Sequence, residues 1–550
     1  MRIGIFFGGP SRERDVSFAG GRTALANLNK ALFDPVLVFV GGWGRFYIVE
    51  PEFLQHESIR DALPKQDGFS VYDESLEEED VIPGEPVDPE WFEDYFDMAF
   101  LAMHGPDCED GAIQGLLEWH KMPYTGPGIL GSGLSINKIL QNHLIALVNG
   151  QEKKTATITR DAWNMADQEA FFTSLVNHLG LPVVVKAPHQ GSSIGVAIVR
   201  ENDLGTFQRA VGQCFFTTTL NLTDWAAMDE RTKANYAQRT ATLSAAVGYP
   251  LIIENTGEYA MHPADLIEKL DDEAEEDADR IFTLASVNAE DELLFEEFIT
   301  GQEFSCGVIQ DDDGMAVALP PTEIYNTEAF DYETKYLNNV AKKRIPVGTS
   351  LENNRAIQVG IEQLFTKLGI NVYSRIDGFL TPEGPAGEAQ RVLFHDPNTI
   401  PGMSPTSLIF KQMAEVGMNL SDSLTYLIRQ SLRERIRTGK DTHRLKQMLI
   451  DLDARLAARK TADLPEQVIH FGPTDDDWVR AKADYNAAAA LAETRPQMVY
   501  LKSKMENHAV PVYFLFKDTI AELEEALTSP RHPLLTETQE RARHITERYV

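Results

Sequence analysis

Short apolar runs alternate with glycine turns and helix-like stretches at the start of the chain. Residues 2–7 form an apolar run, residues 8–10 are Gly-Gly-Pro, and residues 11–29 have a helical spacing of apolar positions. Further apolar runs follow at residues 35–40 and 98–103. This order of strand, glycine turn and helix is typical of doubly wound sheets, where ligands collect at the C-terminal strand ends. We therefore predict an α/β fold that opens with a Rossmann-like domain.

A second pattern combines two apolar runs with a polar glycine loop. Residues 181–199 read LPVVVKAPHQGSSIGVAIV, which predicts a strand ending at Lys186, a loop and a returning strand. Ser192 and Ser193 follow Gly191, so backbone N–H groups and hydroxyls can approach a phosphate without bulky side chains in the way. The P-loop pattern GxxxxGK[ST] is absent from this segment. A hairpin that binds no ligand is the alternative interpretation.

The most informative polar residues at predicted strand ends lie in the third quarter of the chain. Arg375 and Asp377 end one apolar run, and Asp396 and Asn398 follow the next run at residues 392–394. Two carboxylates and an amide on adjacent strand ends can hold Mg²⁺, which prefers oxygen ligands. A nearby arginine can neutralise charge on a transferred phosphoryl group. The cluster therefore predicts ATP-dependent chemistry.

Other loops carry candidate residues, each with an ordinary structural alternative. Residues 104–115, HGPDCEDGAIQG, follow a predicted strand and form either a ligand loop or an acidic surface loop. Lys138, near the start of a predicted helix, either meets a phosphate or faces solvent. Glu303 follows a turn from which backbone groups can reach adenine, and Lys335 and Tyr336 lie in a polar aromatic loop. Alone, none of these loops identifies a function.

Composition narrows the classes of partner. The net charge of −34 makes a nucleic acid or an anionic membrane surface an unfavourable partner. No apolar run is long enough to span a bilayer. Cys108, Cys214 and Cys306 are far apart and show neither CxxC nor zinc-ligand spacing, which fits a reducing cytoplasm. A chain this acidic needs a locally basic pocket to bind ATP.

Seven segments in a fixed order resemble the D-alanine–D-alanine ligases of the ATP-grasp superfamily. They are FFGGPSRERDVSF, HGPDCEDGAIQGLLE, PYTGPGILGSGLSINK, VVVKAPHQGSSIGV, FEEFITGQEF, FDYETKYL and RIDGFL…FHDPNTIPGMSPTSL. The resemblance implies a pre-ATP-grasp α/β domain at 1–128 and two α+β ATP-grasp subdomains at 129–298 and 299–430. It implies that ATP phosphorylates one D-alanine carboxylate and that the amine of a second D-alanine attacks the acyl phosphate. The family acts in the cytoplasmic assembly of peptidoglycan precursors.

The resemblance also implies roles for individual residues. The residues expected to bind ATP are Lys138, Lys186, Ser193, Glu296, Ile299, Glu303 and Lys335. The ligands expected for two Mg²⁺ ions, with Mn²⁺ as an alternative metal, are Asp377, Asp396 and Asn398. The oxyanion is expected to be stabilised by Arg375 and the Gly402 N–H. A hydrogen-bonded triad over the site is expected from Asp15, Ser192 and Tyr336. The subsites of the two D-alanines are expected to include Asp15, His104, Ser407 and Leu408.

Several positions depart from the family pattern. Asp15 and Asp396 stand where the family has Glu, which sets each carboxylate back by about 1 Å. Pro397 replaces a small apolar residue, and Cys108 replaces a glycine. These departures leave two alternatives to D-alanine ligation: a ligase for another D-amino acid or a dipeptide, and a nucleotide-binding relic without ligation. The expected partner is a small amino acid, and a homodimer is a candidate assembly.

Two parts of the chain lie outside the family pattern. Residues 202–288 form a partly helical insertion, interpreted as a lid extension, an oligomer contact or a passive excursion. Residues 431–550 are predicted to be mainly helical, with one strand at 512–516. The basic and apolar helix at 433–459 is predicted to pack against the acidic body rather than to bind a partner.

Overall fold

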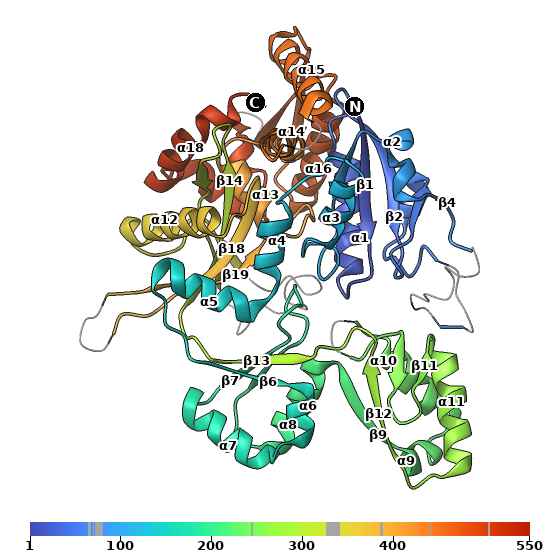
Figure 1. The fold of residues 1–550 in the computed structure, drawn as a ribbon. Helices are drawn as coiled ribbons and strands as arrows, with labels where there is room; N and C mark the ends of the chain where they lie inside the picture. The colour runs from blue at the N-terminus through green and yellow to red at the C-terminus, as the bar shows by residue number, and fades with distance from the viewer. Residues whose placement is uncertain are drawn as a thin grey trace.

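The computed structural model places a broad upper body above two lower lobes (Figure 1). The residues that it describes are 1–63, 68–69, 71, 81–243, 246–325, 342–384, 389–439, 442–503 and 506–550. The upper body holds the N-terminal domain beside the C-terminal ATP-grasp sheet, and the lower lobes are the central sheet and the insertion (Figure 1). No helix among these residues is long and apolar enough to cross a membrane.

The N-terminal domain is built on the predicted parallel strands. Strand β1 (Arg2–Gly8) lies between β2 (Asp34–Val40) and β5 (Met98–Leu101), in the order β4-β3-β2-β1-β5. Helix α1 (Arg14–Asn27) follows the glycine turn and starts three residues later than predicted. The remaining elements are β3 (Phe46–Val49), β4 (Glu85–Pro86), α2 (Phe92–Tyr95) and α3 (Ala112–Trp119). Aliphatic and aromatic residues from both sheet faces are buried, which confirms the predicted α/β opening.

The central subdomain is an antiparallel sheet with helices on one side. Its strand order is β6-β13-β7-β8, and the β7–β8 hairpin confirms the strand, loop and strand expected at 181–199. The strands are β6 (Thr155–Thr159), β7 (Val183–Lys186), β8 (Val196–Val199) and β13 (Glu292–Glu297). Helices α6 (Arg160–Met165), α7 (Gln168–Leu179) and α8 (Leu204–Phe215) pack on this sheet. Phe172, Phe207 and Phe295 pack in its core. Helices α4 (Ile129–Ile136) and α5 (Lys138–Asn149), which were expected in this subdomain, instead contact the C-terminal ATP-grasp subdomain, where Ile145 of α5 is buried.

The insertion has a hydrophobic core that is separate from the main core and that also takes in Phe69 and Val71 of the N-terminal domain. We use the word insertion from here on for residues 217–286, because α8, expected to lie in it, packs in the core of the central sheet. The insertion's strands are β9 (Thr217–Asn221), β10 (Leu251–Ile253), β11 (Glu258–Ala260) and β12 (Ile281–Ser286), in the order β11-β10-β12-β9. Its helices are α9 (Leu222–Ala226), α10 (Glu230–Thr240) and α11 (Pro263–Glu276). Trp225 and Leu266 are fully buried between helices and sheet.

The C-terminal ATP-grasp subdomain supplies the two strands that carry the predicted metal ligands. Strand β18 (Tyr373–Leu380) pairs antiparallel with β19 (Val392–Asn398), with a register shift between Ile376 and Asp377. The other strands are β14 (Gln302–Gln310), β15 (Ala316–Ala318), β16 (Thr322–Tyr325) and β17 (Lys342–Arg344). Helices α12 (Leu351–Lys367) and α13 (Leu408–Glu415) cover the sheet.

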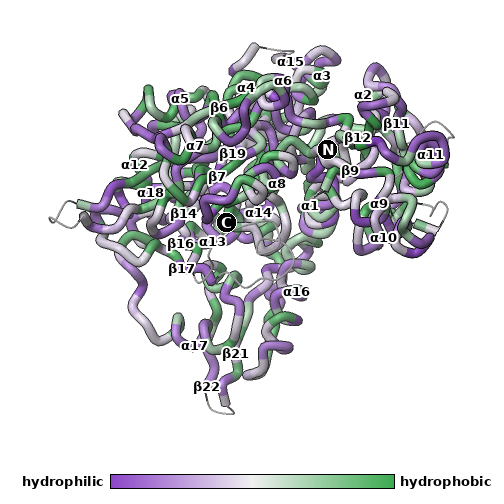
Figure 2. Tube along the Cα trace, turned by 90° about the horizontal axis from the view of Figure 1, so that it is seen from below, coloured by the Kyte–Doolittle hydropathy of each residue, from purple (hydrophilic) through white to green (hydrophobic). Residues whose placement is uncertain are grey.

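The extension, residues 431–550, is mainly helical as predicted but also contains a small sheet. Its helices, counting α14, in which it starts, are α14 (Leu420–Arg437), α15 (Thr442–Thr461), α16 (Asp475–Leu491), α17 (Ile520–Thr528) and α18 (Pro533–Thr546). The sheet has the order β20-β21-β22, from β20 (Glu466–Phe471), β21 (Arg495–Ser503) and β22 (Glu506–Val510). It projects from the body with α17 (Figure 2). The strand predicted at 512–516 is wrong, because Pro511 precedes a short 3₁₀ helix, η5 (Val512–Phe514).

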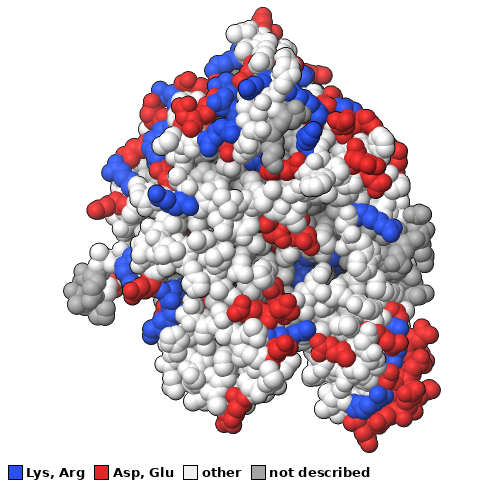
Figure 3. Space-filling view, viewed as in Figure 1, with Lys and Arg blue, Asp and Glu red and all other residues white. Residues whose placement is uncertain are grey.

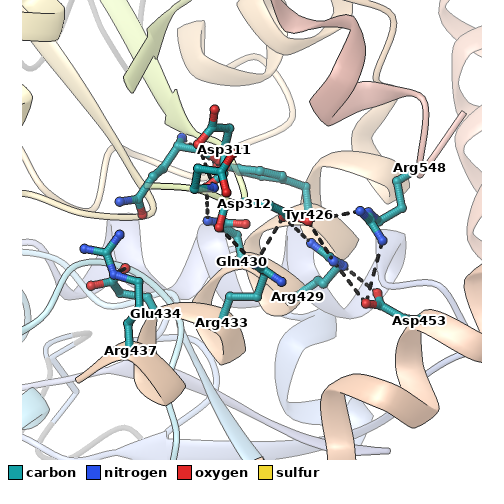
Figure 4. A network of polar contacts seen from close by, with 12 residues as sticks. Asp311, Asp312, Tyr426, Arg429, Gln430, Arg433, Glu434, Arg437, Asp453 and Arg548 are labelled. Carbon is teal, nitrogen blue, oxygen red and sulfur yellow. Dashed lines mark hydrogen bonds and ion pairs between the residues drawn. The ribbon is translucent and has the colours of Figure 1, made fainter. Parts of the chain in front are cut away.

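The range 433–459, predicted as one basic helix, is divided between α14 and α15, but its basic residues pack against acidic residues of the body as predicted: Arg444 lies 3.6 Å from Glu93. Arg429, one per cent exposed, contacts Asp312 at 2.7 Å and Asp453 at 2.6 Å (Figure 4). Arg433 lies 3.3 Å from the same Asp312 carboxylate. The network ties α14 and α15 to the turn between β14 and β15.

Candidate active site

A small cavity of about 70 Å³ lies where the N-terminal domain, the β7–β8 loop and the C-terminal subdomain meet. Most of the predicted catalytic and substrate-binding residues line it. They are His104, Ser192, Arg375, Gly402, Ser407 and Leu408, and the predicted metal ligands Asp396 and Asn398 line the cavity with them. Sequence positions about 300 residues apart therefore meet in one site. Lys335 and Tyr336 lie outside the described residues.

The acidic residue that meets Ser192 is Glu13 and not Asp15. The Ser192 hydroxyl donates a hydrogen bond to Glu13 Oε2, and Glu13 lines the cavity. Asp15 instead lies in the first turn of α1 and forms a 3.0 Å ion pair with Arg60. Because α1 begins at Arg14, Glu13 stays in the loop before the helix and can point into the cavity. The expected contact of Asp15 with Ser192 is thus wrong, and so is the shortened carboxylate inferred there.

The loop around Ser192 is shaped to admit that carboxylate. A Cβ atom on Gly191 would collide with Glu13 Oε1, so any larger residue at this position would displace that carboxylate. Ser192 and Ser193 both have left-handed φ angles, 51° and 62°. Consecutive residues in unusual conformations can turn their N–H groups toward an anion, and such strain is common at ligand sites. That this loop covers phosphates remains a prediction.

The predicted metal ligands lie together on β18 and β19. Arg375 holds both Asp377 oxygens, with Nε and Nη2 at 3.0 Å, and Ser305 donates to Asp377 Oδ1 at 2.6 Å. Asn398 Nδ2 lies 3.5 Å from Asp377 Oδ2, and Asp396 adopts a left-handed φ of 50°. Two carboxylates and an amide in one corner suit a hard divalent cation such as Mg²⁺. The described residues contain no group of three or more His, Cys, Asp or Glu side chains that are placed to hold a metal ion by themselves, so Asn398 or the substrate would have to complete the set.

The predicted ATP lysines converge from two elements. Lys138 donates to the Gln190 carbonyl and lies 3.4 Å from Asp396 Oδ1. Lys186 contacts Glu296 Oε2 at 2.7 Å, and Lys153, which sequence reasoning missed, contacts Glu296 Oε1 at 2.6 Å. Burial opposes ionisation of Glu296, but these two lysines lower its pKa well below the usual range. Glu296 therefore holds Lys153 and Lys186 in place. The phosphate role of Lys186 and the contact of Glu296 with adenine remain predictions.

Two remaining ATP residues lie beside this cluster. Ile299 follows β13 in the turn that leads into β14, and Glu303 lies near the start of β14. Both are close in sequence to Glu296, and Glu303 pairs with Ile324 of β16 in the sheet. Their contacts with adenine and ribose remain predictions.

His104 is buried in neutral form at the edge of the cavity. Its ring Nδ1 lies 2.9 Å from the Ile400 carbonyl oxygen, which identifies Nδ1 as the protonated nitrogen. Burial and, secondarily, Arg375 lower the pKa of His104 to about 4. Nε2 is buried and makes no hydrogen bond within the described residues. The ring therefore offers an acceptor to a donor inside the cavity.

Glu109 and Lys343 also line the cavity, although neither was singled out from the sequence. Glu109 accepts a hydrogen bond from Gly105 N at 2.9 Å. Burial and the neighbouring Glu13 raise the pKa of Glu109 to about 8. The position of Glu109 in the HGPDCEDG loop could have identified it as a candidate site residue, because that loop was already a candidate ligand loop.

Comparisons with known proteins agree with this geometry. The family models described as D-ala D-ala ligase N-terminus and C-terminus match residues 2–127 and residues 151–217 and 214–429. D-alanine–D-alanine ligase A of Brucella melitensis is 25% identical over 442 residues, covering 78% of this chain and 98% of the relative. The ligase of Geobacillus thermodenitrificans is 22% identical and covers 82% and 98%. The structure of the Coxiella burnetii ligase, 20% identical, has a TM-score of 0.52 and covers 81% and 99%, which shows a shared fold.

Proposed function

Because the chain belongs to the D-alanine–D-alanine ligase family, an ATP-dependent carboxylate–amine ligase family, we propose that it joins two D-alanine molecules through an acyl phosphate. The observation that carries the proposal is the convergence of Arg375, Asp396 and Asn398 on the cavity that also holds Ser192 and His104. Asp377 lies directly behind them, bound to Arg375 and 3.5 Å from Asn398. The cavity is small, which favours substrates with side chains as small as a methyl group.

Each charged group has a task that its position suits. Asp377, Asp396 and Asn398 would hold two Mg²⁺ ions, which neutralise phosphate charge when bound. Lys138 and Lys186 approach from the other side, where they would bind phosphate oxygens. Arg375, fixed by two bonds to Asp377, presents a preorganised guanidinium to the oxyanion, together with the Gly402 N–H.

The subsites follow from the remaining residues. Glu13 and the neutral His104 ring both offer acceptors to the ammonium of the first D-alanine. Ser407 and Leu408 begin helix α13, whose first N–H groups would bind the carboxylate of the second D-alanine. The Ser192 loop would exclude water from the acyl phosphate, which hydrolysis would otherwise destroy.

The expected setting is the cytoplasmic supply of D-alanyl-D-alanine for peptidoglycan. The protein's oligomeric state, for which we propose a homodimer, can be measured by sedimentation equilibrium. A ligase for another D-amino acid or a dipeptide is less well supported. That alternative rested on a shorter Asp15 carboxylate in the first subsite, whereas the carboxylate that contacts Ser192 belongs to Glu13, which has the usual length.

Phosphate release from Mg-ATP, measured with D-alanine, with L-alanine and with neither, tests the proposal. We expect release only with D-alanine, with D-alanyl-D-alanine identified by mass spectrometry. Asp377→Asn should lower kcat by about 10³-fold or more, because a metal carboxylate is lost. Glu13→Ala should lower kcat/KM strongly, whereas Asp15→Ala is its matched control with a small effect. Absence of D-alanine-stimulated release from the wild-type protein would refute the function.

A further inference from the structure

Arg12, the residue before Glu13, reaches out of the N-terminal domain into the segment between α10 and β10. Its Nη1 donates to the carbonyls of Leu243 and Ala246 at 3.1 Å each, and its Nη2 donates to the Val247 carbonyl. The side chain is only 5% exposed. A surface loop of the insertion is therefore fastened to the loop that carries Glu13.

This contact buries a charge without a carboxylate partner. No described Asp or Glu lies within ion-pair distance of Arg12, and its buried Nε has no hydrogen-bond partner. Burial lowers the pKa of the Arg12 guanidinium to about 9, with a smaller contribution from Arg14. Burying a cation without a paired carboxylate costs free energy, so an apolar side chain would serve equally well if the position needed only packing.

Arg12 also contacts the residue that supports the loop around Ser192. Its guanidinium stacks on the ring of Phe216 at 3.6 Å from the centroid. Phe216 packs with Ala187 and Ile194, the residues on either side of the loop that contains Ser192. It has a left-handed φ of 58°, a conformation that aromatic residues seldom adopt, so the ring is held in place against local strain.

The chain that leaves the insertion touches the same loop. Glu290 follows β12 and is only 4% exposed. Its Oε2 lies 2.8 Å from His189 Nδ1, and its Oε1 accepts from Gln190 Nε2 at 2.9 Å. The segments that flank the insertion on both sides thus meet residues 189–194, one through Phe216 and one through Glu290.

We propose that Arg12 is a positioning residue that makes the insertion part of the substrate site. Arg12 docks on the insertion and stacks on Phe216, and through Phe216 it fixes the loop that contains Ser192. Its neighbour Glu13 binds Ser192 directly. The loop is thereby held in the form that covers the nucleotide phosphates and the first amino acid. This inference rests on the proposed function for its turnover readouts, but its nucleotide-binding readout is independent of ligation.

Arg12→Ala provides the first test, with Arg22→Ala as a matched control. Arg22 also donates to backbone carbonyls, those of Leu54, His56 and Glu57, and lies over a phenylalanine ring, but on α1 away from the cavity. We expect Arg12→Ala to lower kcat/KM for D-alanine by about 10- to 100-fold, because the loop is misplaced. It should also raise the Kd of a non-hydrolysable ATP analogue with Mg²⁺. Arg22→Ala should change both values less than threefold.

A double-mutant cycle separates positioning from general destabilisation. On the Ser192→Ala background, Arg12→Ala should cost much less than it does alone, because the contact that it serves is already lost. Full additivity with Ser192→Ala, or wild-type kinetics and nucleotide affinity in Arg12→Ala, would overturn the proposal.

Milder variants keep the proposal testable if Arg12→Ala does not fold. Arg12→Lys retains the charge but loses the planar stack and should give an intermediate loss, and Phe216→Leu should reproduce the raised nucleotide Kd. Wild-type nucleotide affinity in both variants would count against the role. If the wild-type protein binds the nucleotide but does not release phosphate with D-alanine, the ligase function fails, and the Kd series alone decides the role of Arg12.

Discussion

The insertion and the extension are both additions to the family pattern, but they are built into the molecule in different ways. Leu432, Leu445 and Leu452 of the extension are buried in the same hydrophobic cluster as the strands of the N-terminal domain. The core of the insertion is a separate cluster around Trp225 and Leu266. The extension is therefore expected to unfold together with the N-terminal domain, whereas the insertion can unfold locally while the main core stays folded.

Polar contacts show the same difference. The extension bridges two domains: Arg455 donates to the Leu32 carbonyl at 3.0 Å, and Gln358 of α12 donates to Thr538 at 2.9 Å. The insertion instead reaches the substrate loop through Arg12 and presents an acidic outer face around α11 (Figure 3). One addition holds domains in place, and the other reaches a loop that must act on a substrate.

The largest expected effect is from a cavity in the shared core. Leu432→Ala, at a fully buried site, should lower the free energy of unfolding by about 3–5 kcal/mol, through lost burial and the cavity left behind. Denaturant unfolding should show the main transition shifted, with ATP binding and the N-terminal domain lost together. A Leu432→Ala protein whose N-terminal domain unfolds at the wild-type midpoint would show that the extension is separate after all.

The matched substitution in the insertion should act locally. Leu266→Ala is also at a fully buried site and should cost about 2–4 kcal/mol, but only in the unfolding of the insertion. Hydrogen exchange should rise in α9, α10 and α11 while the main transition keeps its midpoint. Equal loss of protection in β1 and β2 would contradict two independent cores.

The sequence predicted best those features that depend on nearby residues. Strands at 2–7 and 35–40 and the hairpin at 181–199 follow from apolar runs and glycine turns, and the structure contains each of them. The predicted metal ligands Asp377 and Asp396 lie on neighbouring strands, as their sequence pattern indicated. Local patterns were sufficient in these cases because an apolar run or a glycine turn is read from residues that are adjacent in the sequence.

Features that depend on distant partners were predicted less well. Glu13 and Asp15 are two residues apart, and only the start of α1 decides which carboxylate reaches Ser192. Lys153 becomes significant through Glu296, more than 140 residues away. Strand β20 was missed because only two of its six side chains are buried, so its apolar pattern is weak. In each case the deciding interaction is tertiary.

A smaller effect is expected from the ion-pair network of the extension. Arg429→Ala should cost about 2 kcal/mol, because Asp312 and Asp453 lose their buried partner but remain partly exposed and close to Arg433 and Arg548. Chemical denaturation measures the change. The control is Arg437→Ala on the same helix, where an exposed arginine pairs with Glu434 and where we expect less than about 0.5 kcal/mol. Similar losses of stability in both variants would mean that a buried arginine at position 429 stabilises the fold no more than an exposed one.

The smallest effect concerns the link between the insertion and the substrate loop, and it depends on pH. The hydrogen bond to Glu290 raises the pKa of His189 above its usual value of about 6.5, despite partial burial and Lys138. The protonated pair therefore stabilises the fold below about pH 6.5, and this contribution disappears as the pH rises through the folded-state pKa. His189→Gln should lower stability more at pH 6 than at pH 9, by less than about 1 kcal/mol since the ring is half-exposed. His120→Gln, at a site with no ion pair among the described residues, provides the control for a general histidine effect. A gap between wild type and His189→Gln that widens toward pH 9 would show that Glu290 holds the neutral ring instead.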